Sequence, residues 1–377
     1  MELAKQITQR QSDFCMECGV CTGSCPMSRV LPDFSPRQMI KRAMIDPDGE
    51  LLQGKEIWEC LTCGRCSSRC PVEIDVPEFI RSCRLKALKA GNLPMESHQG
   101  IFQTIAGLQT GDLKQQRTSW AEGAGKFSNS GDFFYFVGCL PYFDPVFSYL
   151  GLSPVESARG VLGLLNKIGI EPVISNDERC CGHDALWSGN EATFRRLAEL
   201  NLEVIRSSGA RTVVFSCPEG YSTFKVQYPK YVGELPFEVL HVTELLGREL
   251  AGKDIAFKPS SNGVITYHDP CRLGRGAGIY DQPRQLLGLI PETSLVEMPR
   301  NRENSLCCGT SAWMECSNCS KSVRLDRLSE AERTGAGTLV TACPKCQIHF
   351  TCARLNSDLK IEVKDLYTYL LENIKGD

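Results

Sequence analysis

Long hydrophobic runs are missing from this sequence. The longest apolar stretch, from Phe133 to Phe143, is too short to span a bilayer and is interrupted by Gly138 and Pro141. The N-terminal segment also lacks the apolar run of a signal peptide. The sequence therefore predicts a cytoplasmic protein, or one that is peripheral to a membrane complex.

Excess positive charge and nucleotide-binding motifs are missing as well. The formal net charge is −3 at pH 7, and no long basic run indicates a nucleic-acid surface. The run Gly274-x-Gly276-x-Gly278 lacks the spacing of a dinucleotide fingerprint, and there is no Walker sequence. We therefore expect any flavin or other two-electron chemistry to come from a partner protein.

Cysteine is the residue in excess, with 21 among 377 residues. In a secreted protein this number would suggest disulfides. Here there is no secretion signal and the spacings are those of metal ligands, so we expect free thiols that bind metal. The length allows two or three domains.

Two cysteine runs in the N-terminal third have the spacing CxxCxxCxxxCP. This is the bacterial ferredoxin run, in which three thiolates bind one [4Fe-4S] cluster and the fourth binds the other cluster. A pair of zinc sites is the alternative, although zinc sites rarely repeat this spacing. The predicted ligand sets are Cys15, Cys18, Cys21 and Cys70 for one cluster, and Cys60, Cys63, Cys66 and Cys25 for the other.

Helix signals surround these runs. Ser35-Pro36 reads as a helix start, and a second helix is expected over residues 76–90. We therefore predict a helical ferredoxin-like domain at residues 1–106 with two [4Fe-4S] clusters. A linker rich in Gly, Ser, Gln and Thr follows at residues 107–130.

The rest of the chain is an internal repeat. Three landmarks recur at nearly one offset: an apolar run ending in Cys, a Cys-Cys-Gly triplet, and a second apolar run ending in Cys-Pro. Helical spacing at 154–168, 190–207 and 323–334 separates the apolar strands. The predicted fold is α+α/β: the helical domain, then two duplicated α/β Cys-Cys-Gly lobes at 131–258 and 259–377, with mainly parallel sheets. The cysteines would lie at the carboxyl ends of strands.

The two repeats differ in one ligand. Five thiolates in the second repeat can surround a large soft metal centre. The first repeat has Gly220 at the position of the fifth cysteine. The second set is Cys271, Cys307, Cys308, Cys343 and Cys346, and the first is Cys139, Cys180, Cys181 and Cys217.

These motifs resemble those of a known family. The Cys-Cys-Gly repeats are similar to the catalytic B subunit of heterodisulfide reductase and to iron–sulfur subunits of glycolate, lactate and anaerobic glycerol-3-phosphate oxidation systems. Cys18-Gly19-Val20-Cys21, Cys25-Pro26 and Ser35-Pro36-Arg37 resemble the two-cluster C subunit of the same enzyme. The whole chain resembles a natural fusion of the two, as in the D subunit of heterodisulfide reductase.

The resemblance implies the type of centre in each lobe. The complete second repeat would hold a noncubane [4Fe-4S] cluster on its five cysteines, as the reactive centre. The four thiolates of the first repeat are compatible with a cubane [4Fe-4S] cluster, a zinc ion or a modified noncubane centre. A relic without metal is the remaining alternative.

The leading hypothesis is therefore an oxidoreductase subunit that relays electrons. They would pass from a flavin-containing partner, such as a protein like the A subunit of heterodisulfide reductase or a dehydrogenase, or from another iron–sulfur protein, to the Cys-Cys-Gly domain, where a disulfide or thiol reacts. The alternative is a non-catalytic electron wire. It would link a flavoprotein dehydrogenase of the 2-hydroxyacid, glycerol-3-phosphate or acyl-CoA type to quinone or a larger redox complex. A zinc-binding interaction protein is a third interpretation.

A few residues have open roles. His268, beside Asp269, is a candidate proton donor at the reactive centre, or half of a pair that fixes the cluster loop. His183 and His349 are also close in sequence to cluster cysteines. The pair Cys316-x-x-Cys319, with Cys352, is either a redox or zinc pair or a loop pair without metal.

Overall fold

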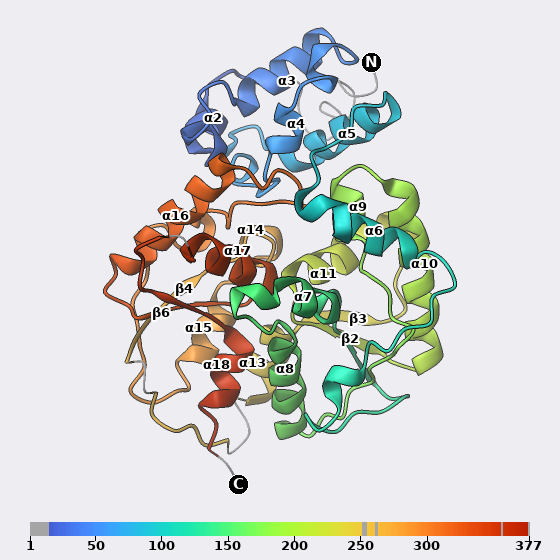
Figure 1. Cartoon of the computed structure of the whole chain (residues 1–377), viewed down its shortest axis with the longest axis vertical. Coiled ribbons are helices and arrows are strands. Elements are labelled where there is room, and N and C mark those ends of the chain that lie inside the picture. The colour runs from blue at the N-terminus through green and yellow to red at the C-terminus, as the bar shows by residue number, and fades with distance from the viewer. Residues whose placement is uncertain (1–14, 251–254, 261–262, 356, 376–377) are drawn as a thin grey trace.

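The computed structural model describes residues 15–250, 255–260, 263–355 and 357–375. A helical N-terminal domain lies at the top of a larger α/β body that contains two sheets (Figure 1). The domain contacts both halves of the body: η1 (Met27–Arg29) meets α16 (Asn318–Glu332) on one side, and α5 (Val76–Lys89) meets α9 (His183–Trp187) on the other. No helix within the described ranges is long and apolar enough to cross a membrane.

The N-terminal domain is built from short helices with side-chain caps. The Ser35 hydroxyl accepts a hydrogen bond from the Gln38 amide at 3.3 Å, and Asp75 caps the next long helix through the Glu78 amide at 3.1 Å. Both helices expected here are confirmed. The elements are α2 (Val20–Ser24), η1 (Met27–Arg29), α3 (Pro36–Ile45), η2 (Glu50–Leu52), α4 (Glu56–Glu59), η3 (Ser67–Arg69) and α5 (Val76–Lys89).

The segment after this domain packs onto the α/β body. The predicted boundary after residue 106 falls inside a helix, whose Phe102 ring stacks on Trp313 with centroids 4.4 Å apart and meets Phe143 edge-on at 5.2 Å. The predicted linker thus begins within a helix that is docked by its aromatic side chain. Its elements are η4 (Ser97–Gly100), α6 (Ile101–Leu108) and η5 (Ser119–Ala121).

The first lobe has a parallel sheet in the order β1-β2-β3. Its strands are short, apolar and almost fully buried, because helices cover both faces. The elements are β1 (Phe133–Phe136), α7 (Leu140–Phe147), η6 (Ser148–Leu150), α8 (Val155–Lys167), α9 (His183–Trp187), α10 (Glu191–Ser208), β2 (Thr212–Phe215), α11 (Pro218–Ser222), η7 (Thr223–Gln227), α12 (Tyr228–Val232), β3 (Glu238–His241) and α13 (Val242–Leu250).

The second lobe repeats this plan with one additional edge strand, in the parallel order β5-β4-β6-β7. The predicted duplicated α/β architecture is confirmed. One predicted helix, 323–334, begins earlier, because the Ser317 side chain caps its first turn. The elements are β4 (Val264–His268), α14 (Gly274–Ala277), α15 (Asp281–Leu287), β5 (Ser294–Leu295), η8 (Arg302–Asn304), α16 (Asn318–Glu332), β6 (Thr338–Thr341), α17 (Pro344–Arg354), β7 (Glu362–Asp365) and α18 (Leu366–Glu372).

The two lobes interlock through their last helices. Helix α18 of the second lobe packs on α8 of the first, and α13 of the first packs on α15 of the second, between the two sheets (Figure 1). At Gly160 in α8 an added Cβ would lie 3.0 Å from backbone atoms of Tyr367 and Thr368. Glycine is needed there for the helices to approach this closely.

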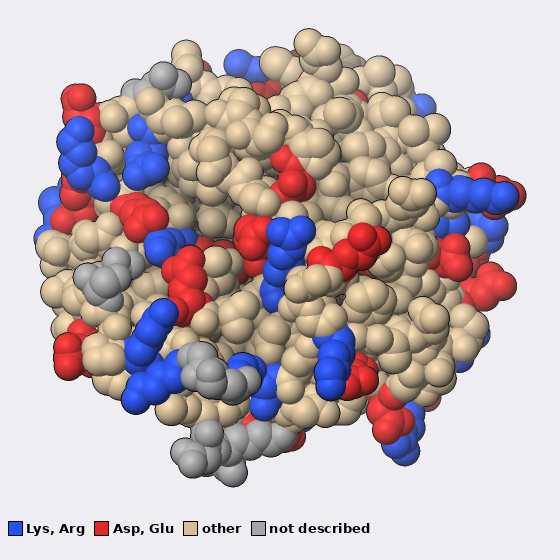
Figure 2. Space-filling model, turned by 60° about the horizontal axis from the view of Figure 1, so that its bottom comes forward, with Lys and Arg blue, Asp and Glu red and all other residues tan. Residues whose placement is uncertain are grey.

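The outer surface shows no large area of one charge on the face in Figure 2. Lys and Arg alternate with Asp and Glu there. The face therefore has none of the basic patches that nucleic-acid binding uses.

Candidate metal centres

Four cysteines line a cavity whose wall is formed by the N-terminal domain alone, which we call the distal cavity. The set is Cys15, Cys18, Cys21 and Cys70. Left-handed backbone at Glu17 and Gly19 curls the loop around the cavity. Cys18 is exposed at its rim. The grouping matches the ligand set expected for one cluster.

A second cavity, the proximal cavity, lies where the domain meets the second lobe. It is lined by Cys25, Cys60, Cys63 and Cys66, the ligand set expected for the other cluster. Thr62 and Gly64 repeat the left-handed pair seen at Glu17 and Gly19. The same loop is therefore built twice, and each run gives its last cysteine to the cavity of the other.

Burial makes thiolates in the proximal cavity costly without a cation. It raises the pKa of Cys25 to about 12 and also raises the pKa of Cys66. Cys63 differs, because its interaction with Cys307, together with the charges of Arg275 and Arg272, outweighs burial and lowers its pKa to about 5. Four converging sulfurs in an apolar wall fit an iron–sulfur cluster, whose irons supply the missing positive charge.

The five cysteines of the second lobe form one connected group. Cys307 is hydrogen-bonded to Cys271 and Cys308, and Cys308 and Cys343 are each bonded to Cys346. The β4–α14 turn, the loop before α16 and the start of α17 carry these thiols, so the set converges at the carboxyl ends of the strands, as predicted.

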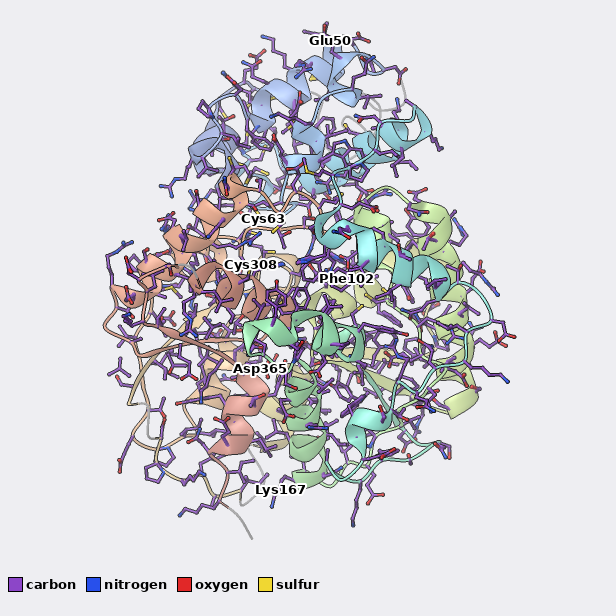
Figure 3. All side chains as sticks on the ribbon, viewed as in Figure 1. Glu50, Cys63, Phe102, Lys167, Cys308 and Asp365 are labelled. Atoms are coloured by element: carbon purple, nitrogen blue, oxygen red, sulfur yellow. The ribbon has the colours of Figure 1, made fainter. Side chains whose placement is uncertain are left out.

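The second lobe touches the proximal cavity directly. The side chains of Cys63 and Cys307 interact where the two meet. Cys63 and Cys308 lie on the two sides of this junction (Figure 3). Thr62 and Ser311 also hydrogen-bond across it, with their hydroxyl oxygens 2.8 Å apart. Metal centres on the two sides would therefore be neighbours.

The four cysteines of the first lobe also converge. The Sγ atoms of Cys139 and Cys180 are 3.7 Å apart, and Cys181 is hydrogen-bonded to Cys180. Gly220 lines the same cavity as Cys181 and Cys217. A Cβ on Gly220 would lie 4.0 Å from the Cβ of Cys181 and 3.2 Å from the Phe215 ring. Position 220 thus faces the thiol group but offers it no ligand.

Residues of the docked linker hold these thiol-bearing loops. The Gln109 side-chain Oε1 accepts a hydrogen bond from the Cys180 amide at 2.7 Å. Arg117 forms a buried ion pair with Glu178 at 2.7 Å, and Glu178 accepts bonds from the amides of Val137 and Gly138. Sequence reasoning missed these residues, because nothing in a polar linker indicates where it docks.

A buried ion pair joins the lobes at equivalent positions of the two repeats. Lys345 stands between Cys343 and Cys346, and Glu219 stands between Cys217 and Gly220. The Lys345 ammonium is 2.6 Å from both the Glu219 and the Asp184 carboxylates. Burial raises the pKa of Asp184, but Lys345 outweighs it and holds that pKa below its usual range. Opposite charges at matched positions of the repeats were a signal in the sequence that could have found this pair.

The same pair occupies a place that could hold a cation. Ligand atoms of His183, Asp184 and Glu219 lie within 4.8 Å of one another. The His183 Nδ1 is 3.0 Å from Asp184 and 3.4 Å from Glu219. The Lys345 ammonium already supplies the positive charge there, and the first-lobe cavity extends from Cys139 and Cys217 to Lys345.

His268, the candidate proton donor, is enclosed in the core of the second lobe. It lies on β4, its Nδ1 accepts a hydrogen bond from Arg327 Nε at 3.2 Å, and the Phe350 ring packs edge-on against it. Burial, with Arg327 adding to it, lowers its pKa to about 3. The ring is therefore neutral at pH 7, which favours the structural interpretation. Its neighbour Asp269 binds Arg284 through both oxygens, at 2.7 and 2.9 Å.

The remaining candidates lie beside the second-lobe centre. His349 Nδ1 is 3.6 Å from Cys308 Sγ. Cys316 is exposed, and Arg324 donates to its Sγ at 3.5 Å.

Comparisons with known proteins agree with this geometry. The cysteine-rich domain model of the CCG family matches residues 133–225 and 265–351, and a 4Fe-4S dicluster domain model matches residues 11–74. The D subunit of dihydromethanophenazine:CoB–CoM heterodisulfide reductase from Methanosarcina acetivorans is 33% identical over 296 residues, covering 76% of this chain and 70% of that protein. The chain belongs to the family of heterodisulfide reductase D subunits.

Other relatives share parts of this heterodisulfide reductase-like chain. The EtfAB:quinone oxidoreductase of Syntrophomonas wolfei is 33% identical over 57% of this chain and 30% of its own length. A crystal structure of a hypothetical protein from Helicobacter pylori has the same fold, with a TM-score of 0.53 and 12% identity over 91% of this chain and 67% of that one. The chain is thus an iron–sulfur oxidoreductase subunit with an electron-relay role.

Proposed function

We propose that the chain carries electrons along a row of metal centres. Two [4Fe-4S] clusters would occupy the distal and proximal cavities. A noncubane [4Fe-4S] cluster would be held by the five cysteines of the second lobe, and a further [4Fe-4S] cluster or zinc ion by the first lobe. The residues involved are the predicted ligand sets, in domains divided as the sequence suggests: 1–106, the linker 107–130, 131–258 and 259–377.

The junction between the N-terminal domain and the second lobe is the observation that carries this proposal, because the Cys63 and Cys307 side chains interact there and the Thr62 and Ser311 hydroxyl oxygens lie 2.8 Å apart. Because ligands of two centres touch, electrons need not cross a gap between the N-terminal domain and the second lobe. When bound, the clusters supply one-electron steps. The protein's part is to hold the sulfurs in place, exclude water around Cys25 and Cys66, and keep the junction rigid.

The far ends of the row indicate where partners would bind. Cys18 and Met16 are exposed beside the distal cavity, so a flavin-containing protein or another iron–sulfur protein would dock there. At the other end, the first-lobe cavity reaches Lys345 of the second lobe. A disulfide substrate would react between the two lobes, at the second-lobe centre. We place the protein in the cytoplasm or at the edge of a membrane complex, where its thiols stay reduced.

Metal analysis and spectroscopy test this proposal on the anaerobically purified chain. We expect about twelve irons or more per chain with matching acid-labile sulfide, since each [4Fe-4S] cluster contains four. We also expect an EPR signal of the oxidised protein that changes when a thiol is added. Zinc in place of iron would contradict the cluster assignment, and a spectrum unaffected by thiols would contradict substrate binding at the cluster.

The electron-wire function is the second candidate, and Gly220 favours it. Disulfide cleavage between two complete centres would need five thiols in each lobe, and the first lobe has four. An assay of the isolated chain with a reduced dye and a disulfide separates the two functions. Turnover supports disulfide reduction. Loaded clusters without turnover support a wire that joins a flavoprotein dehydrogenase to quinone or a larger complex.

A further inference from the structure

Four arginines gather around the proximal cavity, and we call them the junction arginines: Arg65, Arg84, Arg272 and Arg275. Two of them bind main-chain carbonyls of the cysteine loop itself. Arg275 Nε donates to the Cys63 carbonyl at 2.9 Å, and Arg84 Nη2 donates to the Cys60 carbonyl at 2.6 Å. Their positive charges are therefore fixed next to two of the predicted cluster ligands.

The other two junction arginines, Arg272 and Arg65, bind groups on segments next to the cysteine loop. Arg272 donates to the Thr62 hydroxyl at 2.9 Å and lies 4.0 Å over the Trp187 ring. Arg65 donates to the Ser305 carbonyl at 3.3 Å, and Arg275 donates to the same oxygen at 2.6 Å. Hydrogen bonds to neutral groups orient all four guanidinium groups without neutralising them.

None of the junction arginines forms an ion pair with a carboxylate in the described part of the chain. The carboxylate pairs found there involve other cations, such as Arg81, Arg284 and Arg300. Burial lowers the pKa of Arg65 and of Arg84 to about 10, since a buried cation without a counter-charge is costly. Such charges are expected where an anionic group occupies the neighbouring cavity.

The groups next to these cations are the cysteines that we expect to bind the clusters. Burial lowers the pKa of Arg275, but Cys63, Cys271 and Cys307 raise it more. One guanidinium thus interacts with ligands on both sides of the junction. The distal cavity has a sparser arrangement. Arg37 lines it and donates to the Glu17 carbonyl at 3.3 Å, while the nearby Lys41 is paired with the Glu17 carboxylate at 3.1 Å.

We propose that the junction arginines set the order of reduction potentials, so that electrons enter at the distal cavity and move inward. Adding an electron to a cluster adds negative charge, which nearby cations stabilise and burial opposes. The proximal cavity is the more buried of the two, so without these cations its cluster would be the harder one to reduce. With them, one electron passes from the distal to the proximal centre without proton transfer or a change in any covalent bond. This inference depends on the proposed clusters.

The test is an EPR-monitored redox titration of the whole chain with its clusters. Because Cys18 is exposed, an aqueous paramagnetic dysprosium complex should broaden the distal signal more strongly, which assigns the two signals. In the unmodified protein we expect the proximal signal to have the higher potential. In Arg275→Gln we expect that potential to move in the negative direction, with the distal potential unchanged.

Matched variants separate charge from structure. Arg37→Gln removes an arginine that binds a carbonyl of the other cysteine loop, so it should move the distal potential and leave the proximal one. Arg275→Lys, which keeps the charge, should restore most of the proximal potential. Arg272→Gln decides the question if Arg275→Gln loses iron, because Arg272 binds only a hydroxyl and a ring.

Two results would overturn the inference. The first is a distal potential above the proximal one in the unmodified protein. The second is a proximal potential that stays the same in Arg275→Gln and Arg272→Gln with full iron content. A chain that carries no iron–sulfur clusters would instead contradict the proposed function, so the two failures are distinguishable.

Discussion

The two Cys-Cys-Gly lobes share strands, turns and helix starts, yet their cysteines have different surroundings. Those of the second lobe touch Cys63 of the N-terminal domain, and the set is complete. Those of the first lobe are held by linker residues such as Gln109 and end at Gly220. The comparison shows that the fold does not depend on the fifth thiol. What distinguishes the lobes is that the cysteines of the second lobe meet a cysteine of the N-terminal domain.

The largest difference between the lobes is expected when a cysteine of the second-lobe Cys-Cys-Gly triplet is substituted. We expect Cys307→Ser to remove the second-lobe signal and to lower disulfide-dependent turnover by at least ~100-fold, since even partners outside the ligand shell cost 10–100-fold. It removes both a predicted ligand and the contact with Cys63. EPR and the dye assay measure the two effects.

The matched control is Cys180→Ser in the first lobe, at the equivalent position of the repeat. We expect it to leave the second-lobe signal intact. If both variants lost the same signal, the two lobes would not hold separate centres.

The ion pair between the lobes gives the next largest effect. Lys345→Met leaves Asp184 and Glu219 buried without their cation, which typically costs about 3–5 kcal/mol. We expect a matching fall in the free energy of unfolding, measured by chemical denaturation under anaerobic conditions.

A surface lysine serves as the control for this variant. Lys364→Met removes ion pairs at the surface, for which about 0–1 kcal/mol is typical. An equal fall in the free energy of unfolding of the two variants would show that the ion pair between the lobes stabilises the fold no more than a surface ion pair does.

Adding the missing fifth cysteine to the first lobe is expected to have the smallest effect, and it tests directly whether that one residue makes the two lobes differ. Gly220→Cys adds a thiol that faces Cys181, and the Phe215 ring must move by a few tenths of an ångström. We expect iron per chain to rise, or a second thiol-sensitive EPR signal to appear, with stability changed by no more than about 1 kcal/mol. Gly220→Ala, which has the same Cβ but no sulfur, should leave the metal content unchanged. A spectrum identical in both variants would show that position 220 cannot act as a ligand.

Much of this molecule follows from short-range sequence patterns. The two cysteine runs predict their own loops and the exchange of the last cysteine between cavities, because the spacing leaves little geometric freedom. Apolar runs that end in cysteine predict β1, β2, β4 and β6 for the same reason. The start of α16 was missed, because the Ser317 cap outweighs the weak apolar spacing of its first turn.

The sequence by itself determined which thiols form each group, that the lobes are copies, and that one copy lacks a ligand. Only the tertiary structure decided which cavity is proximal and which is distal. It also decided that Lys345 meets Glu219 and Asp184, and that the junction arginines face thiols rather than carboxylates. These facts depend on contacts between segments far apart in the chain. Spacing patterns involve residues that are close in the sequence, so they can be recognised without a structure. Which charged groups meet across two domains is decided only when the domains pack together.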